Sequence, residues 1–369
     1  MYQNLYKILI IILLLFCLSI PIFAQGTQTS SSTFLKRMEE SAGVSFQMCA
    51  ISPKSGDSKT YTAFAIPLQA RYEHNRYMSF SLRLNQGFQS YDKTGLYGLG
   101  DMYVNCRYLF RENITFVGDI TLPIGTDKLS FNEITAASAG RFPFINSQLV
   151  FGNSGFGLNA GASYGHQLNQ ETSIALGAIY YIRGGYTPIK GRSKYDPSDE
   201  LLLAAGIEYG DKENIGFIGD IQLSFYSAEK TDGKKVSEPG TGFAFSGKTF
   251  YHDFRLSTLF YKRGKSDLSY GGEFKPPSIL SFKLSYQEIW SVVPLSLPVS
   301  LMPYIGYEHT GEGTMVDAAN QFLLGGYLMD FYFNGYPLSP FFEISLGSAG
   351  KDTSTFGLKF GTVVSFQVY

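Results

Sequence analysis

The sequence predicts an all-β protein, a closed antiparallel transmembrane β-barrel of about 14 to 16 strands, with twelve strands as the alternative. Apolar and polar residues alternate with period two along most of the chain after residue 43, and the pattern runs to the last residue. In 215–226, the clearest stretch, one row is apolar and the other is mostly polar, as expected of a strand whose side chains point to alternate faces. Many such segments follow an apolar leader, which favours a membrane barrel over a soluble sandwich.

The first 24 residues have the pattern of a secretory signal peptide. Lys7 precedes an uncharged run from Ile8 to Phe16, and a softer apolar stretch ends at Ala24. A retained membrane helix is the alternative, but Pro21 and the small residue at the end favour cleavage. Beyond this leader no stretch is apolar enough for a membrane helix, so any membrane crossing must use strands. Strands can cross lipid only as a closed barrel, because every backbone polar group needs a partner.

Composition agrees with this fold class. The chain has 26 Tyr, 31 Phe and one Trp, together with 40 Gly. Aromatic residues suit strands and the girdles of membrane barrels. Charged residues make up 17% of the chain, below the roughly 25% of soluble domains. The net charge of -1 provides no field that would attract nucleic acid.

One barrel domain, 43–369, is expected after an N-terminal segment, 25–42, that either lies in the periplasm or plugs the pore. Short and long connections alternate between the candidate strands, as in bacterial barrels, and both termini then face the periplasm. The segment 241–262 is divided at 247–248 to keep this alternation, and 291–297 is a short turn. The candidate strands are 43–52, 59–72, 76–86, 98–110, 114–124, 155–166, 172–183, 199–210, 214–226, 241–246, 249–262, 278–290, 298–309, 320–334, 338–348 and 355–368.

The last strand carries an apolar row that continues through Phe366 and Val368 to the C-terminal Tyr369. This ending is similar to the C-terminal signal by which barrel proteins are recognised for insertion, although Tyr369 is one residue out of phase with the row. It predicts the bacterial outer membrane as the location, with outer-membrane lipid and the barrel-assembly machinery as partners.

If the apolar rows face lipid, charged residues on the opposite rows face the lumen, since charge at mid-bilayer is costly. Arg107 and Asp119 flank a short turn, and a structural ion pair is favoured over a selectivity element. Both signs of charge are present, so no strong ion preference is expected. The residues named as lumen-lining are Arg71, Arg83, Arg107, Asp119, Glu208, Asp220, Arg255 and Lys283; Asp253, Asp330, Glu343 and Lys359 share the pattern.

No catalytic, metal or cofactor site is predicted, and the chain is not expected to be an enzyme. The four histidines, His74, His166, His252 and His309, are scattered, whereas a zinc site needs converging ligands. Beyond the leader the cysteines are Cys49 and Cys106, both in strand-like segments, and whether they pair is left open.

A short glycine-rich tract carries a family resemblance. Gly98, Leu99, Gly100 and Asp101 precede a strand, and Pro123 and Gly125 follow the next one. This pattern resembles outer-membrane barrels described as transporters of the meta-pathway of phenol degradation, which are related to channels for long-chain fatty acids and aromatic compounds. The sequence departs from that family where Ser138-Ala139-Gly140 stands in place of a Gly-Ser element.

The resemblance implies passive uptake of small solutes, hydrophobic or aromatic ones among them, through an outer-membrane channel. A local structural reason for the Gly-Leu-Gly-Asp tract is the alternative to a contact with solute. The alternative function is a non-conducting barrel whose external loops, chiefly 125–154, 184–198 and 227–240, mediate adhesion or bind a partner. Whether the lumen is open or plugged is left open.

Overall fold

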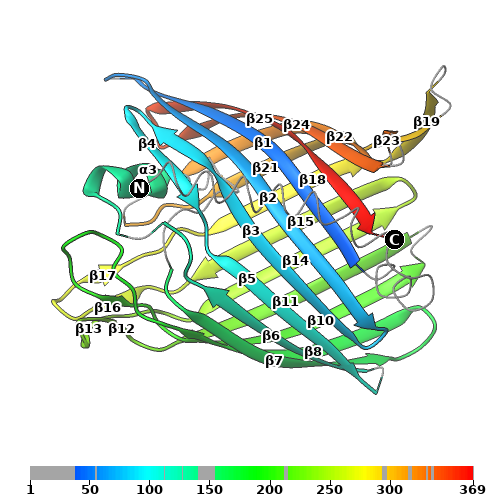
Figure 1. The fold of residues 1–369 in the computed structure, drawn as a ribbon, viewed down its shortest axis with the longest axis horizontal. Helices are drawn as coiled ribbons and strands as arrows, with labels where there is room; N and C mark the ends of the chain where they lie inside the picture. Colours follow the sequence, from blue (N-terminus) through cyan, green and yellow to red (C-terminus); the bar gives the residue numbers. More distant parts are fainter. Residues whose placement is uncertain are drawn as a thin grey trace, which may run out of the picture.

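The chain folds into an antiparallel β-barrel whose strands are tilted and curve around a central space (Figure 1). Residues 1–37, which include the expected signal peptide 1–24, and Tyr369 lie outside the part of the chain that the structure describes. The computed structural model describes residues 38–54, 56–111, 113–126, 128–139, 154–211, 215–292, 297–314, 318–329, 331–333 and 336–368.

Sixteen strands form the wall, each antiparallel to the next along the chain. β25 pairs with β1 from Met38↔Val368 to Pro53↔Thr353, which closes the ring. A closed ring leaves no strand edge without backbone partners, as lipid requires. In order around the ring the strands are β1 (Met38–Pro53), β2 (Lys59–Asn75), β3 (Met78–Tyr91), β5 (Met102–Phe110), β6 (Ile114–Leu122), β7 (Gly157–Gln167), β8 (Thr172–Arg183), β10 (Glu200–Asp211), β11 (Ile215–Tyr226), β14 (Gly242–Tyr251), β15 (Phe254–Arg263), β18 (Ile279–Tyr286), β21 (Tyr304–Thr310), β22 (Ala319–Met329), β24 (Tyr336–Ala349) and β25 (Thr353–Val368).

The strand count corrects the sequence-based expectation, which left fourteen and twelve strands open. The closed barrel has sixteen strands, so the smaller counts are wrong, whereas the all-β barrel class is supported. The candidate strands 43–52 and 241–246 correspond to full members of the wall, β1 and β14. β1 begins at Met38, so its first residues belong to the segment 25–42.

The turn between β14 and β15 lies at His252 and Asp253, not at 247–248 as expected. His252 has a positive φ of 49°, a value typical of a tight turn. Gly247 and Lys248 resemble turn residues in sequence, but they continue the strand's alternation. Lys248 pairs with Ile218 on one side and with Ser257 on the other, so both neighbouring strands hold it in the ladder.

Four short strands lie beside the wall where the sequence suggested longer ones or a plain turn. β4 (Thr94–Leu99) forms a hairpin with β3, so the candidate strand 98–110 is divided between β4 and β5. β19 (Glu288–Val292) and β20 (Leu297–Leu301) form a hairpin where a simple turn, 291–297, was expected. β23 (Phe331–Phe333) pairs with β24.

A second antiparallel sheet of five short strands lies beyond one end of the barrel, opposite the C-terminus (Figure 1). Three long connections between candidate strands, 184–198, 227–240 and 263–277, supply these short strands, so the loops support one another through backbone hydrogen bonds. The strands are β9 (Tyr195–Asp196), β12 (Glu229–Thr231), β13 (Lys234–Glu238), β16 (Ser266–Leu268) and β17 (Glu273–Phe274).

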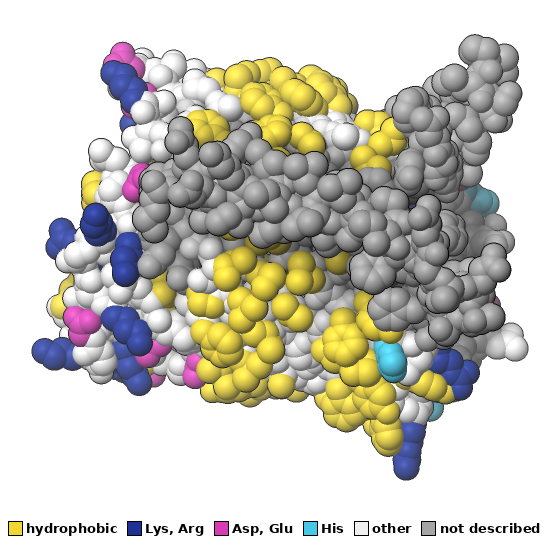
Figure 2. Space-filling model, in the orientation of Figure 1, with side chains coloured by type: hydrophobic (Ala, Val, Ile, Leu, Met, Phe, Trp, Pro, Cys, Tyr) yellow, Lys and Arg dark blue, Asp and Glu magenta, His cyan; other side chains and the backbone are white. Residues whose placement is uncertain are grey.

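The outer face of the barrel carries a broad apolar band, and charged side chains gather towards its ends (Figure 2). Leu176 and Ile221 on the outer row are 60% and 47% exposed. Phe46 and Phe360 meet across the β1–β25 seam with ring centroids 5.2 Å apart. An exposed apolar band on a closed barrel is stable only against hydrocarbon, so the protein is an outer-membrane β-barrel.

Among the residues that the structure describes, no helix combines the length and the apolar character that a membrane crossing needs.

Candidate functional site: the lumen and its mouth

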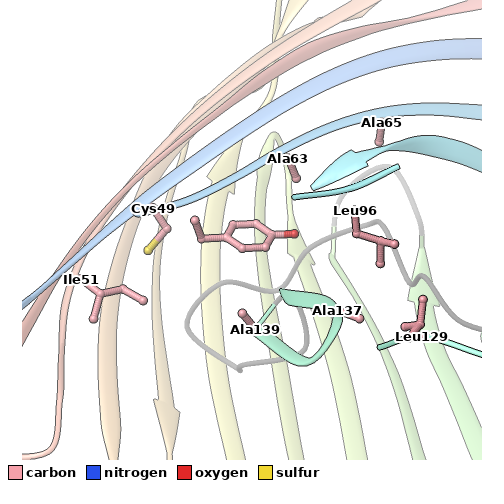
Figure 3. Close-up of a cluster of buried hydrophobic side chains, with 9 residues drawn as sticks. Cys49, Ile51, Ala63, Ala65, Leu96, Leu129, Ala137 and Ala139 are labelled. Carbon is pink, nitrogen blue, oxygen red and sulfur yellow. The ribbon is translucent and has the colours of Figure 1, made fainter. Parts of the chain in front are cut away.

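The inner face of the wall is identified by a helix that packs against it. Helix α3 (Phe131–Ala139) belongs to the long connection between β6 and β7 and lies on the concave side of the wall (Figure 3). Gln89 of β3 donates a hydrogen bond of 3.0 Å to the backbone oxygen of Ala136. The row that contains Gln89 therefore faces the lumen, and the strand register extends this row around the barrel.

Helix α3 begins with a reciprocal cap. The Ser130 hydroxyl accepts a 3.3 Å hydrogen bond from the Glu133 N–H, and the Glu133 carboxylate accepts one of 2.8 Å from the Ser130 N–H. These two bonds satisfy donors that a helix start leaves without partners. The Ser130 N–H, followed by its hydroxyl and the charge of Lys190, lowers the pKa of the Glu133 carboxyl below its usual value.

Alanines let α3 approach the wall closely. Ala136, Ala137 and Ala139 are buried, whereas Asn132, Thr135 and Ser138 on the other side are exposed. A helix thus places a small-residue face on the wall and a polar face towards the remaining lumen. The cluster beneath and beside α3, drawn in Figure 3, comprises Cys49, Ile51, Tyr61, Ala63, Ala65, Leu96, Leu129, Ala137 and Ala139.

Tyr61 and Gln89 are fully buried polar side chains of the wall beside α3. Both are 0% exposed, and the Tyr61 hydroxyl donates to the Gln89 side-chain oxygen over 3.3 Å. The Gln89 amide nitrogen bonds to α3, so the oxygen and the nitrogen of one side chain join the wall to the helix. Buried polar groups with partners fix a single docking position, because any displacement would leave them unsatisfied.

The family-like tract ties down both ends of the connection that carries α3. Asp101 is 4% exposed, and one carboxylate oxygen accepts a 3.0 Å hydrogen bond from the Gly125 N–H. The other oxygen accepts from the N–H of Ser154 over 2.9 Å and from the Ser154 hydroxyl. Gly125 precedes α3 in the chain and Ser154 follows it. Asp101 therefore acts as a clamp on this connection, which is a structural role.

Two glycines of the tract are required by close approach. A Cβ atom at Gly98 would lie 1.9 Å from the Thr126 hydroxyl oxygen, and one at Gly125 would lie 2.7 Å from an Asp101 oxygen. The Thr126 N–H also bonds to the Leu99 oxygen over 3.1 Å. Pro123 directly follows β6 and begins the connection that contains α3. The tract packs against the start of the connection, at the foot of the loop that enters the lumen.

All eight residues named as lumen-lining lie on the inner row by register. Arg83 pairs with Tyr103, and Glu208 pairs with Ile218, both of them inner positions. Asp253 lies in a turn, and Asp330 lies outside the described residues. The placement follows from the pairings that join Arg71, Arg83, Arg107, Asp119, Glu208, Asp220, Arg255 and Lys283 to the row of Gln89.

Arg107 and Asp119 do not face each other directly. Arg107 pairs with Val117, and Asp119 pairs with Asn105, so the two charges are offset by one pair along the same face. Asp119 accepts a hydrogen bond from the Asn105 amide, and its own N–H donates to the Asn159 oxygen over 3.1 Å. The carboxylate is thus held by a neutral neighbour.

One sector of the inner wall carries a mixed-charge network. The Lys283 ammonium lies 3.4 Å from the ring centroid of Tyr304, whose hydroxyl donates to Glu343. Glu343 in turn faces Lys359 across the β24–β25 ladder. A cavity of about 100 Å³ opens beside this network, lined in part by Gln47, Glu308, Gln321, Glu343 and Lys359.

Cys49 and Cys106 lie on opposite faces of the wall. Cys49 is on the inner row beneath α3, and Cys106 pairs with Phe80 and Gly118 on the outer row. Both are free thiols. The histidines do not converge either: His74, His166 and His309 lie on the outer rows of different strands, and His252 lies in a turn. Among the described residues, no group of three or more potential metal ligands is found.

The apolar row of the last strand, β25, faces outwards as expected, at the positions whose side chains are described. Phe356 and Phe360 of β25 are exposed on the outer face. Phe366 and Val368 belong to the backbone of β25, but their side chains, like Tyr369, lie outside the described residues.

Sequence reasoning missed α3, which is the element that fills part of the lumen. Its signal is present, however: Ser130 and Glu133 have capping-box spacing, and Thr135, Ala136, Ala137 and Ala139 follow at helical spacing. The covered wall has a signal too, because the inner positions of β1 and β2 include Cys49, Ala63 and Ala65 where polar residues would be expected.

No protein-family model and no curated protein matches the chain. Among solved structures, OprB of Pseudomonas putida aligns with a TM-score of 0.53 and 8% identity over 91% of this chain and 96% of its own. An outer-membrane channel from Pseudomonas putida F1 aligns with a TM-score of 0.40 and 10% identity over 90% of this chain and 96% of its own. A deletion mutant of TodX, described as a monoaromatic hydrocarbon channel, aligns with a TM-score of 0.44 and 11% identity over 90% of this chain and 91% of its own. At these identities the likeness to OprB shows the fold alone, and the two lower scores carry no argument.

Proposed function

We propose that this protein is a passive channel for small solutes across the bacterial outer membrane, in which the solute gradient drives transport. The observation that carries the proposal is a closed sixteen-strand wall with a polar inner row, of which α3 covers only the arc near β1 to β4. Eight strands are just filled by side chains, whereas sixteen leave room for an aqueous passage.

Small solutes with apolar or aromatic parts are the proposed cargo. The resemblance of the Gly98–Asp101 tract to phenol-degradation transporters supports this proposal. Aromatic residues on the inner row support it as well, since Tyr103, Phe250 and Tyr304 each lie next to a cation. Rings in a lumen wall supply apolar contact without closing the passage to water.

Delivery to the membrane is proposed to follow from the two ends of the chain. Residues 1–24 would direct export, and the last strand, with Phe366, Val368 and Tyr369, would engage the barrel-assembly machinery. The alternative of a non-conducting barrel for adhesion is not favoured, because no described feature of the external loops supports it over transport.

Planar lipid bilayers test the proposal. Addition of the purified, detergent-solubilised protein should produce discrete steps of conductance in salt solution. A control preparation with the same detergent and no protein should produce none. A protein that inserts, as judged by protection from protease in vesicles, and yet leaves the bilayer silent at every voltage would contradict the channel function.

A further inference from the structure

We propose that the lumen is selective for anions, in contrast to the sequence-based expectation of no strong ion preference, and that organic carboxylates are the solute class it fits best. This inference rests on the proposed channel function and specifies its cargo. It comes from five inner-row cations that form two arcs. The first arc is Arg83 and Arg107, on β3 and β5, and the second is Lys248, Arg255 and Lys283, on β14, β15 and β18.

The two arcs face each other across the barrel. Around the ring β3 and β5 are the third and fourth strands, and β14, β15 and β18 are the tenth to twelfth. A separation of about eight strands is half of a sixteen-strand ring. A solute passing along the axis therefore meets positive charge from two opposite sides.

The arcs also stand at a similar depth. Arg107, Lys248 and Lys283 are each the fourth residue from the end of their strand at the rim that carries the short turns. A tilted strand rises roughly 2.5 Å per residue along the barrel axis, so equal counts from one rim give similar heights. Lys248 and Lys283 flank Ser257 in one transverse row.

These cations are not neutralised by close carboxylate partners in the described part of the chain, with one exception. Arg107 and Lys248 have no hydrogen-bond or ion-pair partner there. Arg83 lies 5.3 Å from the ring centroid of Tyr103, and Arg255 lies 5.9 Å from that of Phe250. Lys283 is the exception, since it lies near the charge of Glu343 as well as over Tyr304.

On the strands from β6 to β11, two inner-row acids, Asp119 and Asp220, accept hydrogen bonds from neutral donors. Asp119 accepts from the Asn105 amide, and Asp220 accepts from the Ser246 hydroxyl and, over 2.9 Å, from the Gln222 amide. A carboxylate with such donors has fewer oxygen positions for a passing cation. The inner row of these strands carries two further acids, Glu208 and Glu200, of which Glu200 forms an ion pair with Arg183. The guanidinium and ammonium donors of the arcs, by contrast, are available to an anion.

Apolar surface beside the cations points to organic anions. Ile218 pairs with Lys248 on the inner row and is 37% exposed, and Leu259, which faces Ser246 and Ser281, is 42% exposed. The Phe250 ring adjoins Arg255. A carboxylate with an alkyl chain or ring would place its charge on the cations and its apolar part on these side chains, which a chloride ion does not use.

The reversal potential in a KCl gradient tests the charge preference. Wild-type channels should pass chloride over potassium by about threefold, because rings of one sign of charge select the opposite ion. The double variant Lys248→Gln, Arg255→Gln should lower this ratio towards one. The matched control Lys230→Gln, Lys234→Gln removes two charges from the external sheet and should leave the ratio unchanged.

Hexanoate tests the solute class. Added to one side, potassium hexanoate should briefly interrupt the chloride current in wild-type channels, whereas acetate at equal concentration should not. The Lys248/Arg255 double variant should lose the interruptions. Absence of any conductance would overturn the channel function itself. Conductance with a zero or potassium-selective reversal potential, or equal effects of the two carboxylates, would overturn this inference alone.

Discussion

Two regions of the same inner wall differ in how much of their side-chain surface is exposed. The arc of β1 and β2 is covered by α3, and its inner residues Cys49, Tyr61 and Ala63 are 1%, 0% and 3% exposed. The inner residues Ile218 and Leu259, across the barrel, are 37% and 42% exposed. Both arcs obey the same strand alternation, so the difference comes from the loop that docks on one of them.

The comparison teaches that barrel geometry fixes which way a residue points but not whether water reaches it. Almost complete burial of small residues on an inner row, as at Cys49 and Ala63, indicates a docked segment, because the alternation of a strand does not by itself remove an inner residue from water. An inner row on which charged side chains stand beside exposed apolar ones indicates a surface that no segment covers. The experiments below expose inner-wall residues that α3 covers.

Removal of α3 should have the largest effect. Replacement of residues 131–139 by a short Gly-Ser linker should raise single-channel conductance about twofold or more, since the lumen of a sixteen-strand barrel is wide without a filling segment. Deletion of residues 232–233 at the tip of the β12–β13 hairpin serves as the control and should change conductance little. Equal conductance of the α3 variant and the wild type would mean that α3 does not narrow the passage.

Overpacking the helix should undock it. Ala137 is 5% exposed against the wall, and Ala137→Trp should cost about 1–3 kcal/mol through steric conflict. In a Cys106→Ser background, alkylation of the buried Cys49 by a water-soluble maleimide should become faster. Ser138→Trp, on the exposed side of the same helix, should leave the rate unchanged, and an equal increase for both variants would count against the observed docking face.

Loss of the Asp101 clamp should loosen the connection without removing it. Asp101→Ala leaves two backbone N–H groups and one hydroxyl without their acceptor, at a cost of about 2–4 kcal/mol. We expect a lower melting temperature and larger fluctuations of the open-channel current. Asp57→Ala, at an exposed external position, is the control. A stable, quiet Asp101→Ala channel would assign the tract a role other than clamping.

The helix cap should give the smallest effect. The pKa of Glu133 is lowered in the folded state, so its contribution is present above the usual carboxyl pKa and is lost as the pH falls through the folded value. The rate of Cys49 alkylation should therefore be modestly higher in acid than at neutral pH. The two rates are compared with a thiol reagent that reacts under both conditions. Ser130→Ala, which removes about 1 kcal/mol of capping, should reduce this pH dependence; an unaltered pH dependence would argue against the cap.

The wall was predictable because each strand repeats a local rule. Alternation in 215–226 locates β11, and the apolar even-numbered row identifies the lipid face of β25 at Phe356 and Phe360. The turn after Tyr251 was misplaced, since Gly247 and Lys248 have turn-like chemistry, and only pairing with β11 and β15 keeps them in the strand.

The mouth was not predictable in the same way. The external sheet joins strands such as β9 and β12, which lie far apart in sequence and are only two or three residues long. The docking of α3 depends on Gln89 and Asp101, whose partners are distant along the chain. Such contacts leave no periodic pattern in the sequence, although the capping-box spacing of Ser130 and Glu133 and the alanines that follow indicate the helix itself.

The central claim is that inner rows face water and outer rows face hydrocarbon, and two adjacent residues of β15 test it most directly. Ser257 lies on the inner row and Thr258 on the outer row. In a background without Cys49 and Cys106, each is replaced by Cys and the protein is placed in lipid vesicles. A membrane-impermeant thiol reagent should modify Ser257→Cys at least about tenfold faster than Thr258→Cys, because thiolate forms in water and not in hydrocarbon. Equal rates, or faster reaction at Thr258→Cys, would contradict the account.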